Sequence, residues 1–202
     1  IQGTTSLKPI ECTIFPDRIE TGTFMIAAAI TQGDVTIENC MPKHVEPIAL
    51  KLQEAQVEVE ISENKIRVKG KGPISSVNAK THPYPGFPTD IQAQFMALMT
   101  LAQGQSIIAE TVFENRFMHV SELKRMGADI SLDGHTAIIN GVKSLSGAPL
   151  MATDLRASAS LVLAALAAKG PSIISRVYHI DRGYVDIEKK LSKLGAQIRR
   201  IK

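Results

Sequence analysis

Hydrophobic residues gather in three long apolar runs, at residues 22–30, 95–102 and 157–168. Each run predicts a helix with apolar or small side chains on every side, and a helix of that kind belongs in a protein interior. An aspartate precedes each run and a glycine, the residue best suited to a left-handed helix cap, follows it. The intervals from aspartate to glycine are 16, 14 and 16 residues, for the pairs Asp17 and Gly33, Asp90 and Gly104, and Asp154 and Gly170. This regularity predicts three similar units that pack through central helices.

A second set of patterns follows each glycine and completes the unit. It consists of a short strand, an amphipathic helix and a stretch of alternating residues typical of strands. The short strands are predicted at 35–37, 106–108 and 172–174, and the amphipathic helices at 45–55, 118–127 and 185–195. The alternating stretches predict hairpins at 57–61 with 65–69 and at 129–132 with 136–140, but only one strand, 197–201, in the third unit. A further alternating stretch at 10–15 predicts a strand before the first helix.

We predict a mixed α/β (α+β) fold in a single domain over residues 1–202. The units span about residues 8–70, 76–142 and 147–202, each in the order β-α-β-α-β-β, and the third unit lacks its last strand. With apolar helices in the centre and sheets outside, the fold is an inside-out α/β barrel, the reverse of helices arranged around a parallel sheet. An incomplete sheet leaves unpaired backbone groups at its edge, so we expect another part of a longer protein to pair there.

Composition and charge narrow the range of partners. Lys and Arg total 23 against 20 Asp and Glu, which gives a formal charge of +3, and 4% of the residues are aromatic. A nucleic-acid-binding surface is normally more basic and more clustered. The uncharged stretch 157–168 has 12 residues, whereas a membrane-spanning helix needs roughly 20. We therefore expect neither a nucleic-acid partner nor a membrane span.

Cysteine usage and short motifs indicate the compartment and the cofactor needs. Cys12 falls in the predicted strand 10–15 and Cys40 in a turn, and we expect both thiols to be structural. No secretion leader opens the sequence, so a reducing cytoplasm is the expected location. No His, Cys or carboxylate spacing fits a zinc site, and no glycine-rich phosphate loop occurs. We expect no metal and no cofactor.

Four short segments carry the candidate chemistry: residues 85–90, 113–117, 153–156 and 179–184. In two of them an aspartate, Asp90 or Asp154, follows a threonine and begins an apolar helix. A carboxylate there can cap the free backbone N–H groups, which is the simpler interpretation. A helix start also favours anions, so the same position can belong to a binding site.

The same segments contribute three arginines, Arg116, Arg156 and Arg182. Each lies near the end of a predicted element, where loops gather, and a guanidinium fork matches a carboxylate or phosphate with two hydrogen bonds. An anionic small molecule is therefore a natural partner. Ordinary surface salt bridges are the simpler alternative, for instance between Arg182 and Asp181 or between Arg156 and Asp154.

These segments, together with residues 16–22 and 87–127, resemble the C-terminal half of the UDP-N-acetylglucosamine enolpyruvyl transferase family. The resemblance covers about residues 1–202. It implies one of two similar domains with the substrates, UDP-N-acetylglucosamine and phosphoenolpyruvate, bound in the cleft between them. It also implies transfer of enolpyruvyl to the sugar 3-hydroxyl with release of phosphate, the first committed step of peptidoglycan synthesis. The complementary N-terminal domain is absent from this chain and is its expected partner.

The resemblance also implies roles for individual residues. Asp90 would contact the sugar hydroxyl and accept its proton, and Arg182 would bind phosphoenolpyruvate. Val112 and Phe113 would line the UDP-sugar site. Positioning or domain-closure roles would fall to three further residues, Arg116, Asp154 and Arg156. Because the family's other domain supplies a Lys, two Arg and a flexible loop bearing a Cys, the isolated chain is expected to be inactive.

Three alternatives stay open on the sequence alone. The first is a non-catalytic module of the same fold that holds an anion. The second is a relative of the enolpyruvylshikimate phosphate synthases, which share the three-unit architecture without these strings. The third is an RNA-processing protein built from similar units, although three Tyr, six Phe and a charge of +3 offer little for base stacking or phosphate tracking.

Overall fold

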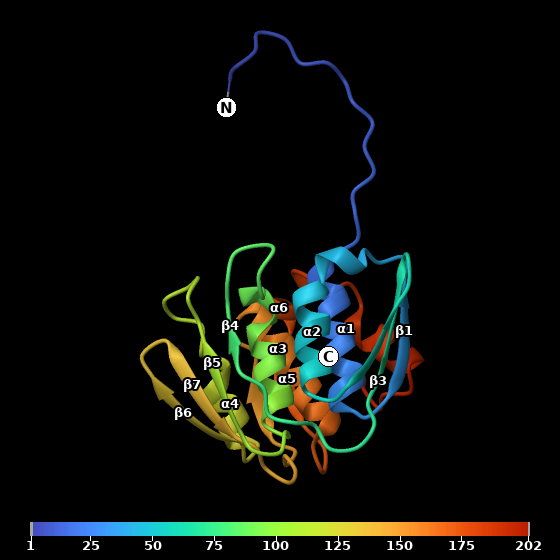
Figure 1. Ribbon diagram of the computed structural model, residues 1–202. Helices are drawn as coiled ribbons and strands as arrows, with labels where there is room; N and C mark the ends of the chain where they lie inside the picture. The colour runs from blue at the N-terminus through green and yellow to red at the C-terminus, as the bar shows by residue number, and fades with distance from the viewer. Residues whose placement is uncertain (1, 202) are drawn as a thin grey trace.

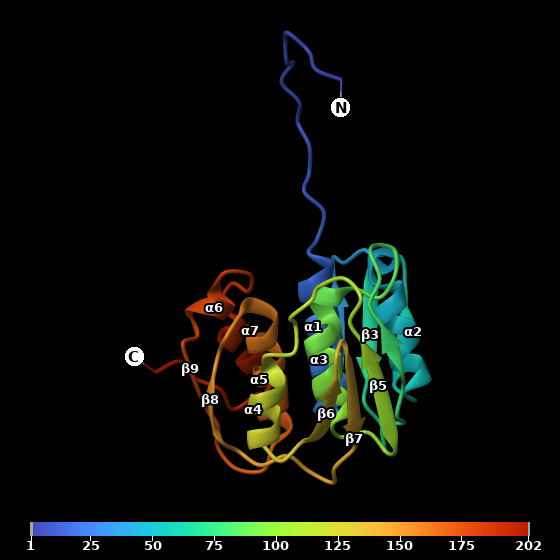
Figure 2. The same ribbon diagram turned by 90° about the vertical axis from the view of Figure 1, so that its left-hand side faces the viewer.

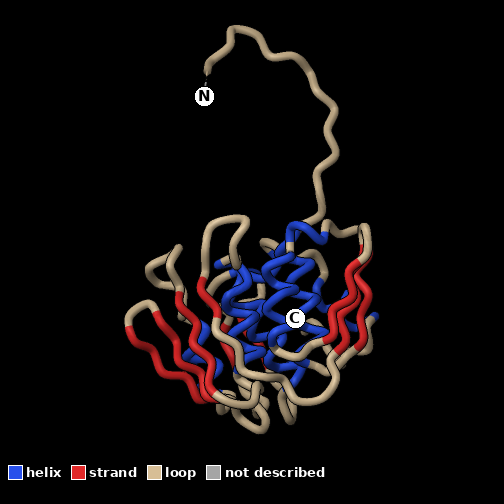
Figure 3. Tube along the Cα trace, viewed as in Figure 1, coloured by secondary structure: helices blue, strands red, loops and turns tan. Residues whose placement is uncertain are grey.

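Three helices lie side by side at the centre of the computed structural model, which describes residues 2–201, and the strands lie outside them (Figure 1, Figure 3). They are α1 (Arg18–Ile30), α3 (Thr89–Met99) and α5 (Leu155–Ala167). Side chains on all faces of α3 are buried, including those of the polar residues Gln92 and Gln94. The three apolar runs of the sequence thus form buried helices that pack on one another.

The central helices begin in two different ways. The carboxylate of Asp17 accepts a hydrogen bond from the Ile19 backbone N–H (2.8 Å), and that of Asp154 accepts from Arg156 and Ala157 (both 2.9 Å). The predicted caps are therefore confirmed for α1 and α5. In α3 the cap position is Pro88, which makes no side-chain hydrogen bond, and Asp90 lies inside the first turn. The capping interpretation of Asp90 is wrong because its carboxylate has other partners, described below.

Two of the sheets flank the first and third central helices. In one, β3 (Lys65–Lys69) pairs antiparallel with both β1 (Asp34–Glu38) and β2 (Glu58–Ile61), and β2 and β3 form the predicted hairpin. In the other, β8 (Pro149–Met151) pairs parallel with β9 (Ile173–Ser175). The smaller sheet stops at these two strands.

The remaining sheet has four strands in the order β4-β5-β7-β6. The predicted second hairpin joins β6 (Asp129–Asp133) to β7 (Thr136–Asn140), and β7 also pairs antiparallel with β5 (Gln105–Ala109). At the far edge β4 (Ala79–Lys80) runs parallel to β5. Alternate residues of β5 are buried, as expected for a sheet with one face on the core.

Shorter helices lie outside the central three (Figure 2). The predicted amphipathic helices appear as α2 (Glu46–Glu54), α4 (His119–Arg125) and α7 (Ile187–Lys193), and each buries one face. Two single turns, η1 (Pro42–His44) and α6 (Tyr178–Asp181), complete the helices of residues 2–201. No helix in that range is both long enough and apolar enough to cross a bilayer.

Two predicted strands do not form. Residues 10–15 run away from the body without a partner (Figure 1), and Ile10 and Ile14 are 84% and 87% exposed. Cys12, which we placed in that strand, is likewise exposed, whereas Cys40 is buried. Residues 197–201 form no strand either. Alternation makes a segment suitable for a sheet, but a strand also needs hydrogen bonds to a neighbouring strand, and neither segment pairs with a strand in residues 2–201.

The number and pairing of the strands therefore differ from those of the predicted three-unit repeat. Only the second unit contains all six elements, from β4 to β7, and the three sheets stay separate, with three, four and two strands. The sheet topology of residues 2–201 therefore gives a mixed α/β fold without a closed barrel. Gly104 and Gly170 take the predicted left-handed conformation, with φ of 106° and 85°, but they lie beyond the helix ends, where Thr100 and Ala168 are the cap residues. After α1, Gln32 takes that conformation (φ 56°) instead of Gly33.

We predict that Gly141→Ala strongly destabilises the chain. A Cβ atom at Gly141 would lie 1.6 Å from the backbone carbonyl oxygen of Ala102, and backbone cannot move aside as a flexible side chain can. The free energy of unfolding, measured by urea denaturation, should fall by about 3 kcal/mol or more. Gly3→Ala is the matched control, because a Cβ there meets nothing within 4 Å. Equal stabilities of the two variants would contradict the observed packing.

Candidate active site

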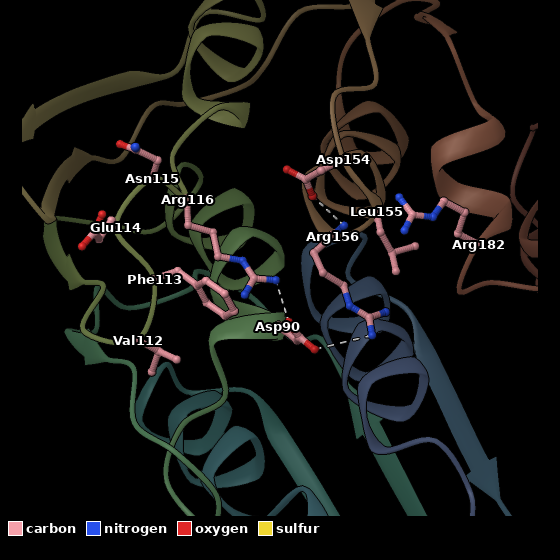
Figure 4. Close-up of a pocket in the computed structure, with 10 residues that line it drawn as sticks. All are labelled: Asp90, Val112, Phe113, Glu114, Asn115, Arg116, Asp154, Leu155, Arg156 and Arg182. Carbon is pink, nitrogen blue, oxygen red and sulfur yellow. Dashed lines mark hydrogen bonds and ion pairs between the residues drawn. The ribbon is translucent and has the colours of Figure 1, made fainter.

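A cavity of about 720 Å³ opens where the first turns of α3 and α5 meet the loop after β5 and the residue that follows α6 (Figure 4). Sites for small molecules commonly have volumes of roughly 300–1,000 Å³. All seven residues singled out in the sequence line it: Asp90, Val112, Phe113, Arg116, Asp154, Arg156 and Arg182. The fold therefore brings four separate segments of the chain to one place.

Asp90 lies at the centre of the charged groups in this cavity. Its Oδ1 accepts a hydrogen bond from Nη2 of Arg116 at 2.6 Å, and its Oδ2 lies 3.6 Å from Nη2 of Arg156. Figure 4 shows the carboxylate between the two guanidinium groups. The second distance is an ion-pair contact that is too long for a hydrogen bond. Oδ1 of Asp90 therefore has a hydrogen-bond donor already in place, whereas Oδ2 can still accept its first hydrogen bond.

Arg116 reaches Asp90 from the loop between β5 and α4. Its Nη1 donates to Oγ1 of Thr89 (3.0 Å), and its guanidinium carbon lies 4.6 Å from the centre of the Phe113 ring. A cation over an aromatic face is attracted by the electrons of the ring. The side chain of Arg116 is thus held by a carboxylate, a hydroxyl and a ring, which leaves it little conformational freedom.

Arg156 approaches Asp90 from the opposite side, on the first turn of α5. Its guanidinium carbon lies 5.5 Å from the centre of the Tyr184 ring. The Tyr184 hydroxyl is 2.9 Å from Oγ1 of Thr23 and accepts from Nε2 of Gln94 at 3.3 Å. Tyr184 therefore joins α1, α3 and the cavity, and burial raises the pKa of its phenol.

Arg182 contrasts with the two paired arginines. It is exposed, and no carboxylate of residues 2–201 lies within ion-pair distance of it. The simpler alternatives considered above do not occur: Asp181 pairs with Arg200 (2.6 Å), and the ion-pair partner of Arg156 is Asp90. Asp154 uses its carboxylate to cap α5. Arg182 is therefore the cavity arginine that is available to an anionic ligand.

Several groups around the cavity had no role assigned from the sequence. Glu114, Asn115 and Leu155 line it and Tyr184 packs behind Arg156; all lie within the segments singled out above, but nothing in the sequence distinguished them individually. His119, at the start of α4, is buried with neither ring nitrogen hydrogen-bonded. The pKa of His119 is lowered to about 4, chiefly by burial, while the charge of Asp154 opposes the shift and that of Arg116 adds to it.

No group of three or more His, Cys, Asp or Glu side chains in residues 2–201 is arranged to hold a metal ion. In the cavity Arg116 and Arg156 pair with Asp90.

Comparison with known proteins places the chain in a family. Residues 1–191 match the model of the EPSP synthase (3-phosphoshikimate 1-carboxyvinyltransferase) family, and the chain belongs to that family. Within it, the chain is 61% identical over 202 residues to the UDP-N-acetylglucosamine 1-carboxyvinyltransferase of Desulfatibacillum aliphaticivorans. It is 55% identical to the enzyme of the same name from Myxococcus xanthus. All of this chain is covered in both alignments.

The relatives are longer proteins. The chain covers 49% of the Desulfatibacillum protein and 48% of the Myxococcus protein, so it spans about half the length of the curated relatives it matches. Among solved structures, the enolpyruvyl transferase NikO from Streptomyces tendae superposes with a TM-score of 0.83 at 29% identity, over 93% of this chain and 45% of NikO. EPSP synthase from Acinetobacter baumannii shares the fold, with a TM-score of 0.73 at 20% identity. The match covers 90% of this chain and 46% of the EPSP synthase chain.

We predict that His119 makes the folded state less stable in acid. The pKa of a free histidine, 6.5, falls to about 4 for His119 in the folded chain. Between pH 6.5 and about pH 4, His119 is therefore protonated in the unfolded state and neutral in the folded state. The free energy of unfolding should therefore decrease as the pH falls from about 6.5 to about 4, with a contribution from His119 of up to about 3 kcal/mol.

The measurement is urea denaturation of the wild type and of His119→Gln across this pH range. The variant removes the titrating ring, so its stability should depend less on pH than that of the wild type. His135→Gln is the matched control, since His135 is exposed at a hairpin turn. An identical pH dependence of the wild type and His119→Gln would contradict the burial of a neutral imidazole.

Proposed function

We propose that the chain is the C-terminal half of a UDP-N-acetylglucosamine enolpyruvyl transferase. The enzyme would move enolpyruvyl from phosphoenolpyruvate to the sugar 3-hydroxyl and release phosphate, in the cytoplasm, as the first committed step of peptidoglycan synthesis. The observation that carries this proposal is the single cavity in which Asp90 lies between two arginines beside the unpaired Arg182. The 61% identity to enzymes of that name supports the choice of substrate.

Asp90 is the proposed proton acceptor. In the reaction the oxygen of the sugar 3-hydroxyl forms a bond to C2 of phosphoenolpyruvate and a proton is added at C3. Loss of phosphate and of a C3 proton then restores the double bond. Oδ2 of Asp90, 3.6 Å from Arg156, can accept the hydroxyl proton, while the 2.6 Å hydrogen bond from Arg116 fixes Oδ1. A general base must lie within hydrogen-bond reach of its proton, and the partly exposed Asp90 side chain lines the cavity that a substrate would enter.

Arg182 is the proposed ligand of phosphoenolpyruvate. That substrate carries a carboxylate and a phosphate, and a guanidinium fork binds either group with two hydrogen bonds. Arg116 and Arg156 are already committed to Asp90, so we assign them positioning roles, and Asp154 holds α5 in place through its cap. These assignments leave Arg182 as the group on this wall that meets the leaving phosphate.

Val112 and Phe113 form the proposed wall for the UDP-sugar. They are 39% and 54% exposed, on the loop that carries Arg116. Exposed apolar side chains beside a charged cavity are suited to the faces of a sugar or a base. An opposite wall would come from the other half of the protein, which would also supply the remaining groups for phosphoenolpyruvate and for protonation at C3.

We further infer that the fold is three repeated units with helices inside and sheets outside, and that the rest of the protein completes the third. β9 pairs with β8 on one edge only, whereas its counterpart β5 pairs with β4 and with β7. Beside it lies a groove of about 500 Å³ whose lining includes Leu166, Ile173 and Ile198. A strand added antiparallel to β9 would satisfy the open edge and cover these side chains.

We predict that the isolated chain releases no phosphate above background from phosphoenolpyruvate and UDP-N-acetylglucosamine. This chain supplies one wall of the proposed cleft, and the groups that would bind phosphoenolpyruvate and protonate C3 from the other wall belong to the other half of the protein. Mixing with a separately produced N-terminal half should restore phosphate release, measured colorimetrically. Release by the chain alone would contradict this prediction.

The same mixing experiment separates the alternatives. Association of the two halves without transfer of enolpyruvyl would favour the anion-binding module. Phosphate release with shikimate 3-phosphate in place of the UDP-sugar would favour an EPSP synthase-like enzyme. Binding to RNA with a steep salt dependence would favour the RNA-processing alternative.

We also predict that two substitutions in the reconstituted protein separate the roles of the charged groups. Asp90→Asn removes the proton acceptor and should mainly lower kcat. Arg182→Ala removes a charged hydrogen-bond donor and should mainly raise KM for phosphoenolpyruvate, by the factor that corresponds to about 1.5–3 kcal/mol. Initial rates at varied phosphoenolpyruvate measure both effects. An unchanged KM in Arg182→Ala would contradict the assignment of Arg182.

A further inference from the structure

Glu110 is a buried carboxylate that the proposed reaction does not use. It follows β5 directly, and its side chain is 2% exposed. Four donors surround it: the hydroxyls of Thr81 (2.8 Å) and Thr89 (2.9 Å), and the backbone N–H groups of Val112 (2.9 Å) and Phe113 (3.1 Å). A buried carboxylate requires such partners, because an unpaired buried charge is very costly.

The direction of the hydrogen bonds between Glu110 and the two threonine hydroxyls follows from the other hydrogen bonds that these hydroxyls make. Oγ1 of Thr81 accepts from the Thr111 backbone N–H (2.8 Å), and Oγ1 of Thr89 accepts from Nη1 of Arg116 (3.0 Å). Since the N–H groups can only donate, each hydroxyl has its own proton left for Glu110. The carboxylate therefore accepts all four bonds, three of them at Oε1 and the one from Thr89 at Oε2.

One of these bonds connects Glu110 to the cavity. The Thr89 hydroxyl donates to Oε2 of Glu110 and accepts from Arg116, and Arg116 in turn donates to Oδ1 of Asp90. Arg116 donates in both directions, to Asp90 on one side and to the Thr89 hydroxyl on the other, and that hydroxyl passes the hydrogen bond on to Glu110. Negative and positive charges alternate through it, from Glu110 to Arg116 to Asp90.

We propose that Glu110 is a positioning residue that orients Arg116 toward Asp90 through the Thr89 hydroxyl, a role in the reaction that rests on the proposed function above. Without Glu110 as acceptor, the Thr89 hydroxyl can turn its proton elsewhere and Arg116 loses a fixed partner. The same carboxylate holds the backbone of Val112 and Phe113, so it also sets the loop that lines the cavity. Networks of this kind are strongest when every member is satisfied.

The alternative is that Glu110 has a purely structural role and only holds the backbone of the loop at Val112 and Phe113. In that case Glu110→Gln would leave Arg116 unchanged, although Thr89→Val would still remove a direct partner of Arg116. The orienting role requires that both variants change Arg116, so Glu110→Gln tests the distinction and Thr89→Val tests the link through which Glu110 acts. Thr89→Ser keeps the hydroxyl and should behave like the wild type. Thr100→Val is the matched control, a buried threonine at the other end of α3 whose hydroxyl donates only to the Ala97 carbonyl of the same helix.

The first measurement needs no catalysis. In the chain labelled with ¹⁵N-arginine, the restrained guanidinium of Arg116 should give resolved Nη signals. We expect Thr89→Val and Glu110→Gln to average these signals through faster rotation, and Thr89→Ser and Thr100→Val to retain them. The amide spectrum of each variant shows that it is folded. If Glu110→Gln does not fold, Glu110→Asp, which keeps the carboxylate and draws it back by one methylene group, replaces it, and retained Arg116 signals in either folded variant would overturn the proposal. Resolved Arg116 signals in Thr89→Val would overturn the proposal.

The second measurement is kinetic and uses the protein reconstituted from both halves. Thr89→Val should lower kcat by between about tenfold and about a hundredfold, the range typical of a misplaced catalytic group, with KM for phosphoenolpyruvate unchanged. Thr89→Ser should restore the rate. An inactive wild type with the expected Arg116 signals would contradict the proposed function and leave the orienting role intact. A fully active Thr89→Val would overturn the role of Glu110.

Discussion

Close packing among three apolar helices determines where every other part of this structure lies. Small side chains, such as Ala28, Ala97 and Ala159, are buried on α1, α3 and α5 and let the helices approach one another. Helices α3 and α5 also begin at the same end, as the ion pair between Asp90 and Arg156 on their first turns requires. The charged cavity is thus a consequence of how the core packs.

Electrostatic compensation makes a charged cavity compatible with that core. Asp90, Arg116 and Arg156 are partly buried, and each would be costly there without an opposite charge. Behind them, the fully satisfied Glu110 and the aromatic ring of Tyr184 hold the two arginines on opposite sides of one carboxylate. The remaining arginine, Arg182, has no such partner, so the cavity presents one positive group to an incoming anion.

Within the described residues, two surfaces of the chain have strand-like backbone or exposed apolar side chains without a neighbouring strand. The extended residues 2–17 carry exposed apolar side chains such as Leu7 (88% exposed), and β9 has an open edge beside an apolar groove. Both are strand-like surfaces without a partner in residues 2–201. On the proposed function, the complementary half of a longer protein meets them, and the cavity becomes one wall of a cleft with two walls.

Local features of the sequence determined the helices, the hairpins and two of the three helix caps. A helix closes its hydrogen bonds within a few residues, so its apolar period and its capping aspartate are visible in the chain itself. The hairpin strands 65–69 and 136–140 were likewise predictable, because their partners follow within one turn. The resemblance to a known family identified the cavity residues, but spacing alone left each of them open to a simpler interpretation.

Only the tertiary structure decided that residues 10–15 and 197–201 stay unpaired, that Asp90 contacts Arg116 and Arg156, and that Glu110 lies behind them. These contacts join segments far apart in sequence, and their energy depends on distances that the packing of the core sets.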